Sequence, residues 1–297
     1  MSKTPLVSIL INCFNSQKYI KECLTSALNQ TYKNIEIIIW DNSSTDNTQN
    51  IVNSINDKRI KYFKNNSFVS LGVARIQATR HLSGDLIAIL DSDDLAYENR
   101  ILDQVNVFLN DRKIGLVGGW MNLIDNKSNI VSAYRPKFNK YSLNDHIFWS
   151  NPLIHSSIMY RKSFAEKLNW YSLKITNFQD YQLIIKISLN YKIVNIHKFM
   201  GAKRNHDDNS IKNSKTYGKQ LKDYKLLLRY VRFYIPKNNF FLKRMNLNSI
   251  KVNELKILIF NFLENKTFKN IFYIFLYIVK NPIVLIHNGY IRKYIIN

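Results

Sequence analysis

Short, continuously apolar segments alternate with amphipathic segments along the first 124 residues. The apolar segments occupy residues 7–11, 35–40, 60–65, 86–90 and 114–124. Between them apolar residues recur at intervals of three and four, which predicts helices near residues 20–28, 46–56, 70–82 and 101–109. Because strands that are apolar along their whole length are buried on both faces, the pattern predicts a mostly parallel, Rossmann-like α/β sheet covered by helices.

Polar side chains follow three of these segments at the same relative place. Asn12 and Asn15 follow the first, residues 41–46 follow the second, and residues 91–94 follow the fourth. The carboxyl ends of parallel strands meet at one edge of a sheet, and ligands bind there. Helix N-capping explains single Ser, Thr, Asp or Asn residues in such turns. It does not explain three aspartates within residues 91–94, because one cap needs one side chain.

The acidic segment "DSDD" predicts a divalent cation. Asp91 and Asp93 leave the strand on the same side, whereas Ser92 points away, because strand side chains alternate. Two carboxylates a few ångströms apart raise each other's pKa unless a cation lies between them. Oxygen ligands favour Mn²⁺ or Mg²⁺, and Mg²⁺ takes further ligands from water and substrate phosphates. The segment therefore predicts a metal-bridged diphosphate site, with an exposed acidic loop as the alternative.

The ordered set of motifs resembles the inverting glycosyltransferases of family 2, which have the GT-A fold. The segment "VSILINCFNSQKYIKECLTSALNQTYKNIEIIIWDNSSTDNT" is similar to the family's opening, and "GDLIAILDSDD" is similar to its Asp-x-Asp element. The resemblance covers residues 6–124 and, more loosely, residues 150–210. It implies an enzyme that transfers a hexose or N-acetylhexosamine from a nucleoside-diphosphate sugar.

The resemblance also implies roles for the residues that match the family's motifs. It implies a donor-binding set of Asn12, Asn15, Asp41, Asn42, Arg75, Asp91, Ser92 and Arg204, and a metal-binding set of Asp93, Asp94 and His206. Asn12, Asn42 and Ile76 depart from the residues usual at those positions. An amide at 42 both donates and accepts hydrogen bonds, whereas a carboxylate only accepts. The nucleobase therefore stays open, with uridine as the default and thymidine or guanosine as alternatives.

An inverting transfer needs a general base to deprotonate the acceptor hydroxyl. Asp180 opens a predicted helix over residues 180–190 and matches the family's base, next to Gln179, which replaces the usual Glu. The alternative is that Asp180 only favours the helix N-terminus, and the two interpretations are compatible.

Two segments resemble later parts of the family. In "NPLIHSSIMYRKS" we expect His155 on the acceptor side, and a structural histidine is the alternative. In "GAKRNHDDNSI" the resemblance implies Arg204 as a phosphate partner and His206 as a metal ligand, with an ordinary polar loop as the alternative.

The basic charge lies mostly in the C-terminal third. The last hundred residues carry +15 of the net charge of +22. Residues 217–235 predict an amphipathic helix, and residues 268–294 mix aromatic side chains with Lys and Arg. Such segments favour an anionic membrane surface. The alternatives are a helical subdomain packed on the catalytic domain and a codon bias that enriches Lys and Asn. Nucleic acid is disfavoured by the acidic segment.

The sequence thus predicts a GT-A catalytic domain over residues 1–215, with a nucleotide-sugar half (1–124) and an acceptor half (125–215), followed by a basic helical region over residues 216–297. The acceptor is expected to be a glycan or lipid-linked glycan of a surface polysaccharide such as lipopolysaccharide or capsule. No secretory signal and no membrane-spanning segment are predicted, and two cysteines fit a reducing compartment. We therefore expect a cytoplasmic location, with peripheral attachment to the inner face of the cytoplasmic membrane.

Three other functions agree less well with the sequence. A sugar-phosphate nucleotidyltransferase would need a glycine-rich loop after the first strand, where "NCFNSQKY" has no glycine. A Rossmann dehydrogenase would need G-x-G-x-x-G after a strand, which is absent. A non-catalytic, membrane-associated glycan-assembly binding module would not need Asp91, Asp93 and Asp180.

Overall fold

The computed structural model describes residues 4–136, 143–148, 150–171, 178–206, 214–233, 243, 246–251, 253–254, 257 and 277. The chain divides into two compact units, which are described separately. The first contains residues up to 144 together with residues 151–206, and the second contains residues 145–150 and the residues after 206. In the described ranges, every helix is too short or too polar to cross a membrane.

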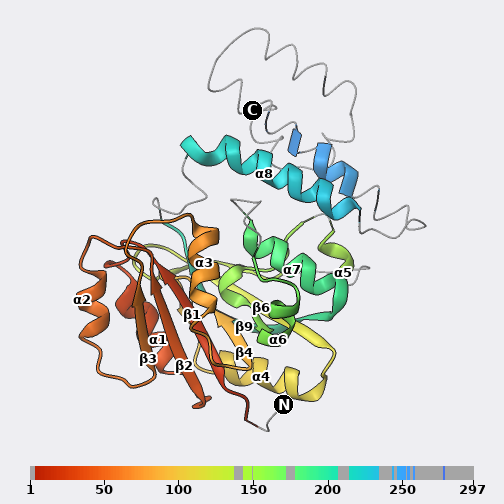
Figure 1. Cartoon of the computed structure of the whole chain (residues 1–297). Helices are drawn as coiled ribbons and strands as arrows, with labels where there is room; N and C mark the ends of the chain where they lie inside the picture. Colours follow the sequence, from red (N-terminus) through yellow and green to blue (C-terminus); the bar gives the residue numbers. More distant parts are fainter. Residues whose placement is uncertain are drawn as a thin grey trace. The chain divides into compact units, whose positions relative to one another are not determined.

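The N-terminal half of the first unit is the predicted parallel sheet. Its strands are β1 (Val7–Cys13), β2 (Ile35–Asp41), β3 (Ile60–Lys64) and β4 (Leu86–Ile89), hydrogen-bonded in the order β3-β2-β1-β4. The connecting helices are α1 (Ile20–Leu28), α2 (Thr48–Asn53) and α3 (Leu71–Thr79) (Figure 1). Every residue of β2 and β4 is buried, as continuously apolar strands require. The strand order reverses between β1 and β4. A ligand is therefore expected at the carboxyl ends of these two strands.

The remaining strands give a mixed extension of the same sheet. They are β5 (Leu95–Ala96), β6 (Ile114–Ile124), β7 (Ile130–Tyr134), β8 (Met159–Arg161) and β9 (Lys192–Arg204). β8 joins β4 to β6 through antiparallel pairs, β9 lies parallel to β6, and β5 pairs antiparallel with β9. Sequence periodicity did not reveal β5 and β8, because strands of two or three residues are too short to show a period.

Hydrogen bonds from helix α4 (Arg100–Asn110) hold the end of β4 in place. Its buried Arg100 guanidinium donates hydrogen bonds to the carbonyls of Ile89 (2.7 Å) and Ile158 (3.1 Å). Its buried Gln104 amide donates to the carbonyls of Val117 and Ser157. These bonds satisfy backbone groups at the end of β4, inside β6 and in the segment just before β8. The segment that follows β4 therefore starts from a rigid point.

Loop contacts hold the turn between β1 and α1. Helix α1 begins at Ile20, and no side chain caps it. The Ser16 carbonyl accepts from the backbone N–H of Ile20 (3.0 Å). Asn15 takes a positive φ of 49°, which asparagine tolerates, and its side-chain oxygen accepts from the Thr45 N–H (2.9 Å). Asn15 thus ties the β1 turn to the β2 turn.

The second unit contains the predicted amphipathic helix, α8 (Ser214–Arg232). Its apolar residues Leu221, Leu228 and Val231 are buried. Within the same unit, the Asn253 amide donates to the Leu221 carbonyl, and Glu254 pairs with basic side chains of α8. In the part of this unit that is described, these apolar side chains of α8 therefore serve packing. The basic aromatic segment 268–294 lies outside the described residues except for Tyr277.

The pairing of β5 with β9 depends on Gly201. A Cβ atom at this position would lie 2.0 Å from the Leu95 carbonyl oxygen, which belongs to the backbone and cannot turn aside. We predict that Gly201→Ala lowers the stability of the first unit by roughly 2 kcal/mol, or about 4–8 °C in Tm. Thermal unfolding would measure this shift, with Ser132→Ala on the exposed strand β7 as the control. An unchanged Tm for Gly201→Ala would contradict the close approach of the two strands.

Candidate active site

The end of β4, the end of β9 and the single-turn helix His155–Ser157 converge beyond the sheet edge. Asp91 contacts His155, because Nδ1 of the histidine lies 3.0 Å from Oδ1 of the aspartate. The Ser156 hydroxyl accepts from the Asp91 N–H (3.1 Å). His155 Nε2 is buried and has no hydrogen-bond partner among the residues described. The imidazole is therefore oriented through Nδ1, toward Asp91.

Asp91 is held in its ionised form. Desolvation by the surrounding protein raises its pKa, but the charge and hydrogen bond of His155, together with the charge of Arg75, bring the pKa below its ordinary value. The side chain is still 41% exposed. Asp91 is thus a stable anion that a ligand can reach from the sheet edge.

Asp93 is less well compensated than Asp91. Its Oδ2 lies 2.9 Å from Nε2 of His206, the residue that follows β9 closely. Burial and the charge of Asp91 raise the pKa of Asp93, and the hydrogen bond from His206 offsets this only in part. The His206 ring also packs against Tyr19, with ring centroids 5.1 Å apart. Asp93 is partly exposed, so a cation could reach this incompletely compensated carboxylate, whereas the pKa of the buried Asp94 is raised even further.

Asp94 and Arg204 are engaged by the fold itself. Both carboxylate oxygens of the buried Asp94 accept hydrogen bonds, one from the Ser156 hydroxyl and one from the Arg204 N–H (2.8 Å). The Arg204 guanidinium donates to the Asp93 carbonyl (2.9 Å) and to Glu22 (2.7 Å). Through these contacts, Asp94 and Arg204 join β9 to the segment 91–94. Ser92 points elsewhere, and its hydroxyl lies 2.9 Å from that of Ser16.

The residues that end β2 shape the donor side through neighbouring loops. The fully buried Asp41 accepts from the Ser44 N–H (2.7 Å) and from the Tyr62 hydroxyl. The Asn42 amide donates to the Val69 carbonyl (2.8 Å) and accepts from the Val69 N–H (3.2 Å). A carboxylate at 42 could not donate, so this two-way bond explains the departure from the family pattern. Asn12 keeps a buried Oδ1 without a partner in the described ranges.

Two aromatic residues that the sequence prediction missed stand at the same edge. Phe14 follows β1 directly and is 46% exposed, and Phe68, next to the clamped Val69, is 62% exposed. Their ring centroids lie 4.7 Å apart. Exposing two packed aromatic rings is unfavourable unless a ligand or partner covers them. The available sequence signal was an apolar residue inside each of two otherwise polar turns.

On the other side of the site, Arg75 of α3 reaches α7 (Gln179–Asn190). Its Nη1 donates to Gln179 Oε1 (3.3 Å), and its Nη2 lies 3.4 Å from His155 Nδ1. Asp180, the predicted base, is the acidic residue of the first turn of α7 and is partly exposed. Asp91, His155 and Arg75 therefore contact one another in turn. Arg75 in turn contacts Gln179, the residue before Asp180.

The described residues offer a divalent cation only part of a ligand set. Across the described ranges, no group of three His, Cys, Asp or Glu side chains is arranged to hold a metal ion. Asp93 and His206 nevertheless supply an oxygen and an imidazole nitrogen in contact, beside a second carboxylate, Asp91. Imidazole nitrogen is less suited to Mg²⁺, which prefers oxygen. Phosphate oxygens and water would complete the coordination.

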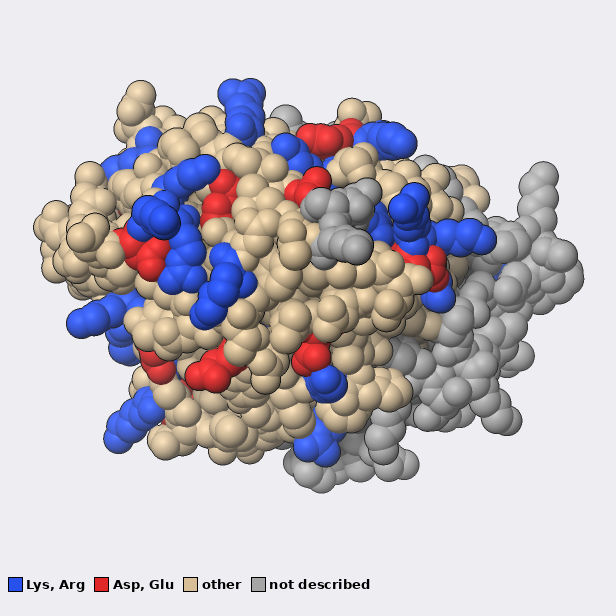
Figure 2. All heavy atoms as spheres, turned by 90° about the horizontal axis from the view of Figure 1, so that it is seen from below, with Lys and Arg blue, Asp and Glu red and all other residues tan. Residues whose placement is uncertain are grey.

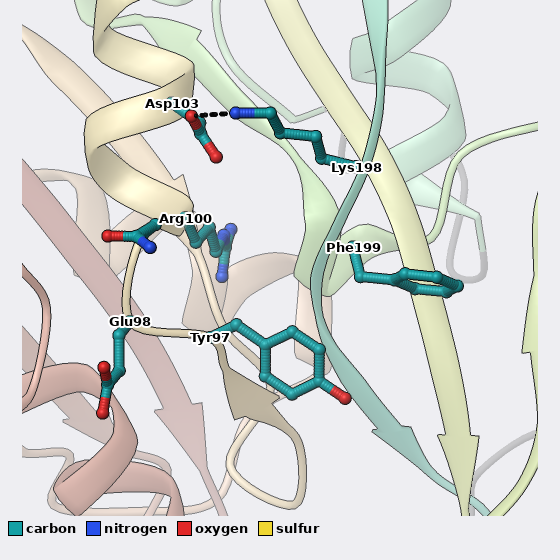
Figure 3. A pocket seen from close by; sticks show the side chains of 7 residues that line it. Tyr97, Glu98, Arg100, Asp103, Lys198 and Phe199 are labelled. Atoms are coloured by element: carbon teal, nitrogen blue, oxygen red, sulfur yellow. Dashed lines mark hydrogen bonds and ion pairs between the residues drawn. The ribbon is translucent and has the colours of Figure 1, made fainter.

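A separate pocket of about 470 Å³ lies between the start of α4 and β9 (Figure 3). It is lined by Tyr97, Glu98, Asn99, Arg100, Asp103, Lys198 and Phe199. Lys198 and Asp103 form an ion pair of 2.7 Å at its border. The lining shares no residue with the predicted site. On the face drawn in Figure 2, the Lys and Arg side chains of the described residues are interspersed with acidic and uncharged groups.

Comparison with known sequences supports one family. A family model described as glycosyl transferase family 2 matches residues 8–168, more than half of the chain. An uncharacterized glycosyltransferase of Methanocaldococcus jannaschii is 32% identical over 232 residues, which cover 76% of this chain and 78% of the relative. The Escherichia coli UDP-Glc:alpha-D-GlcNAc-diphosphoundecaprenol beta-1,3-glucosyltransferase WfaP is 46% identical over 109 residues, which cover 37% of this chain and 43% of WfaP.

Two solved structures share the fold. S. aureus TarS in complex with UDP-GlcNAc matches with a TM-score of 0.63 at 18% identity, over 86% of this chain and 72% of that chain. The mannosyltransferase PcManGT from Pyrobaculum calidifontis, in complex with GDP-Man and Mn²⁺, matches with a TM-score of 0.58 at 14% identity, over 97% and 88%. The likeness confirms the predicted α/β fold class.

The crowding at Asp93 predicts an unusual effect of neutralisation. Asp93→Asn removes a charge that burial and Asp91 disfavour, so in the presence of EDTA we expect Tm to rise by about 2–4 °C, which corresponds to roughly 1 kcal/mol. Any stabilisation by UDP with Mn²⁺ should be lost in the same variant. Thermal unfolding would test both effects. Asp125→Asn is the control and should lower Tm, because hydrogen bonds from Asn129 lower the pKa of Asp125 and so favour its charged form. A destabilised Asp93→Asn would refute the crowding.

Proposed function

The chain belongs to glycosyl transferase family 2, and on that premise we propose that it transfers a sugar from a UDP-sugar to a hydroxyl group of a lipid-linked glycan, with inversion at the anomeric carbon. The relative WfaP is named for a UDP-Glc donor and a diphosphoundecaprenol acceptor, and TarS has been solved with UDP-GlcNAc. The observation that carries the proposal is the convergence of Asp91, Asp93 and His206 at the carboxyl edge of the sheet.

In this proposal the donor lies across the ends of β1, β2 and β4. Phe14 and Phe68 offer an aromatic surface for the base, and the loops held by Asp41 and Asn42 enclose the ribose. Asp93 and His206 would hold Mn²⁺, which supplies positive charge that stabilises the leaving diphosphate. Asp91, kept ionised by His155, faces the ribose or the metal.

The reaction then needs one proton acceptor from this chain. The acceptor oxygen forms a bond to the anomeric carbon while the bond from that carbon to the diphosphate oxygen breaks, and the electron pair leaves with UDP. Asp180 takes the proton of the acceptor hydroxyl. Its carboxylate lies in the first turn of α7, where the partial positive charge of the helix N-terminus interacts favourably with a negative side chain. Arg75 and His155 then lie between the donor and acceptor sides.

The proposal extends to the setting of the enzyme. We place it on the cytoplasmic side of the membrane, acting in the assembly of a surface polysaccharide, because a diphosphoundecaprenol-type acceptor presents its glycan at a membrane surface. A non-catalytic binding module is the rival, and turnover distinguishes the two. A sugar-phosphate nucleotidyltransferase is disfavoured because the segment between β1 and α1 lacks a glycine-rich phosphate loop.

The direct test is a panel of UDP, GDP and dTDP with their sugars, with and without Mn²⁺. A ligand at about 100 times its Kd adds roughly 2.7 kcal/mol of stability, so thermal unfolding would reveal the preferred base. UDP release from UDP-Glc and UDP-GlcNAc would then show turnover. A stabilising effect confined to UDP with Mn²⁺ is expected, and stabilisation by no nucleotide would refute the proposed donor class.

The role of Asp180 predicts a separation of chemistry from binding. Asp180→Asn keeps the shape of the side chain but removes the basic carboxylate, so we expect turnover to fall about 10²–10⁴-fold with UDP affinity unchanged. Rates of UDP release and calorimetric titration with UDP would measure the two quantities. Asp103→Asn, which alters a surface carboxylate of α4, is the matched control. Full activity of Asp180→Asn would exclude it as the base.

The aromatic pair predicts the opposite separation. Stacking of a base on an aromatic side chain contributes about 1–3 kcal/mol, so Phe14→Ala should weaken UDP binding about 5–150-fold. Phe68→Ala should act in the same direction, whereas Phe233→Ala, which alters a side chain that is 88% exposed in the second unit, should not. Titration with UDP and Mn²⁺ would measure the affinities. Equal affinities for all three variants would remove the aromatic pair from the donor site.

A further inference from the structure

The first turn of α7 is held in an uncommon backbone conformation. Phe178, the residue before the helix, has φ 62° and ψ 28°, in the left-handed region that bulky residues rarely adopt. Such a conformation persists only where surrounding contacts enforce it, and it is found most often at functional sites. The next residue, Gln179, anchors the start of α7 through its side chain.

The side chain of Gln179 packs between two residues of α3. Its side chain is 1% exposed, and its Oε1 accepts from Arg75 Nη1 (3.3 Å). On the other side, a Cβ atom added at Gly72 would lie 3.1 Å from Gln179 Nε2. A glycine inside a helix disfavours helix formation, so its presence at 72 is explained by the room that it leaves for the glutamine. The amide of Gln179 therefore fits between a glycine and an arginine of the same helix.

Arg75 connects this contact to the donor side. Its Nη2 lies 3.4 Å from Nδ1 of His155, and the same Nδ1 lies 3.0 Å from Asp91. A single ring nitrogen cannot accept from Arg75 while it donates to Asp91. The shorter contact and the charge of Asp91 favour donation to the carboxylate, so Arg75 lies beside the ring with its own hydrogen bond directed to Gln179. The Tyr171 ring, 5.6 Å from the guanidinium, borders the same space.

We propose that Arg75 and Gln179 are positioning residues that fix the first turn of α7, so that Asp180 faces the acceptor hydroxyl while Asp91 is held against the donor. This inference rests on the proposed function, in which Asp180 is the base. Misplacement of a reacting group by about 1 Å costs on the order of 100-fold in rate. Gln179 touches neither substrate in this scheme and acts only through the backbone that it anchors.

The test compares two identical substitutions on one helix. Gln179→Leu removes the acceptor for Arg75 while it keeps similar volume. Gln182→Leu is the matched control, because Gln182 is also buried in α7 and its Oε1 has no hydrogen-bond partner within the described residues. UDP release from UDP-GlcNAc with Mn²⁺ measures kcat and KM, and titration with UDP measures donor affinity. We expect Gln179→Leu to lower kcat about 10–100-fold with KM and UDP affinity within threefold of wild type.

A conservative variant and a physical measurement complete the test. Gln179→Glu keeps an acceptor for Arg75 and should retain kcat within about threefold. Hydrogen exchange at the backbone amides of residues 182–185, the first that bond within α7, should accelerate at least tenfold in Gln179→Leu and not in Gln182→Leu. This readout does not depend on turnover. Unchanged kcat or unchanged exchange in Gln179→Leu would overturn the inference, as would equal losses in the two Leu variants.

Failure of the inference and failure of the proposed function give different results. If Asp180→Asn abolishes turnover and Gln179→Leu does not affect it, the function stands and the positioning role falls. If Asp180→Asn retains turnover, the base is misassigned, and the inference falls with it because Asp180 would no longer need to be positioned.

Discussion

Repulsion among the three carboxylates after β4 is the constraint that shapes this end of the molecule. The fold compensates each one differently. Asp91 pairs with His155, and the pKa of this carboxyl is lowered. Asp94 is buried and receives hydrogen bonds from Ser156 and from the backbone of Arg204. Asp93 contacts His206, and burial and neighbouring charge raise the pKa of both Asp93 and Asp94. The protein thus compensates Asp91 internally, whereas Asp93 and Asp94 remain crowded, and of these two only the partly exposed Asp93 can be reached by a ligand.

Rigid anchors around this segment make that division possible. Arg100 ties the carbonyls of Ile89 and Ile158, so the end of β4 cannot relax away from the crowded charges. Positive φ angles at Asn15, Ser43 and Phe178 mark three further loops near the site. Asn15 is held by hydrogen bonds with Ser44 and Thr45. Strained backbone of this kind needs support from its surroundings, and here side-chain contacts between loops supply it.

The sequence was sufficient for the parallel strands and for the helices between them, because burial on two faces leaves continuous apolar runs. It was insufficient where tertiary contacts decide. β5 and β8 are too short to show a period. The clamp of Asn42 on Val69 depends on a loop 27 residues away, and the burial of Asp94 depends on Arg204, which is 110 residues away. Motif spacing therefore located the site, whereas only coordinates separate the side chains engaged by the fold from those left for a ligand.

The neutral amide at 179 has an electrostatic consequence for the whole site. A carboxylate there would also accept from Arg75, and the guanidinium charge would compensate it, so the contact between α3 and α7 tolerates either side chain. The amide fixes the helix geometry without adding charge. The positive charge of Arg75 then remains available to Asp91, whose pKa it helps to lower. One arginine therefore serves both halves of the site, because it donates to Gln179 on α7 and its charge acts on Asp91.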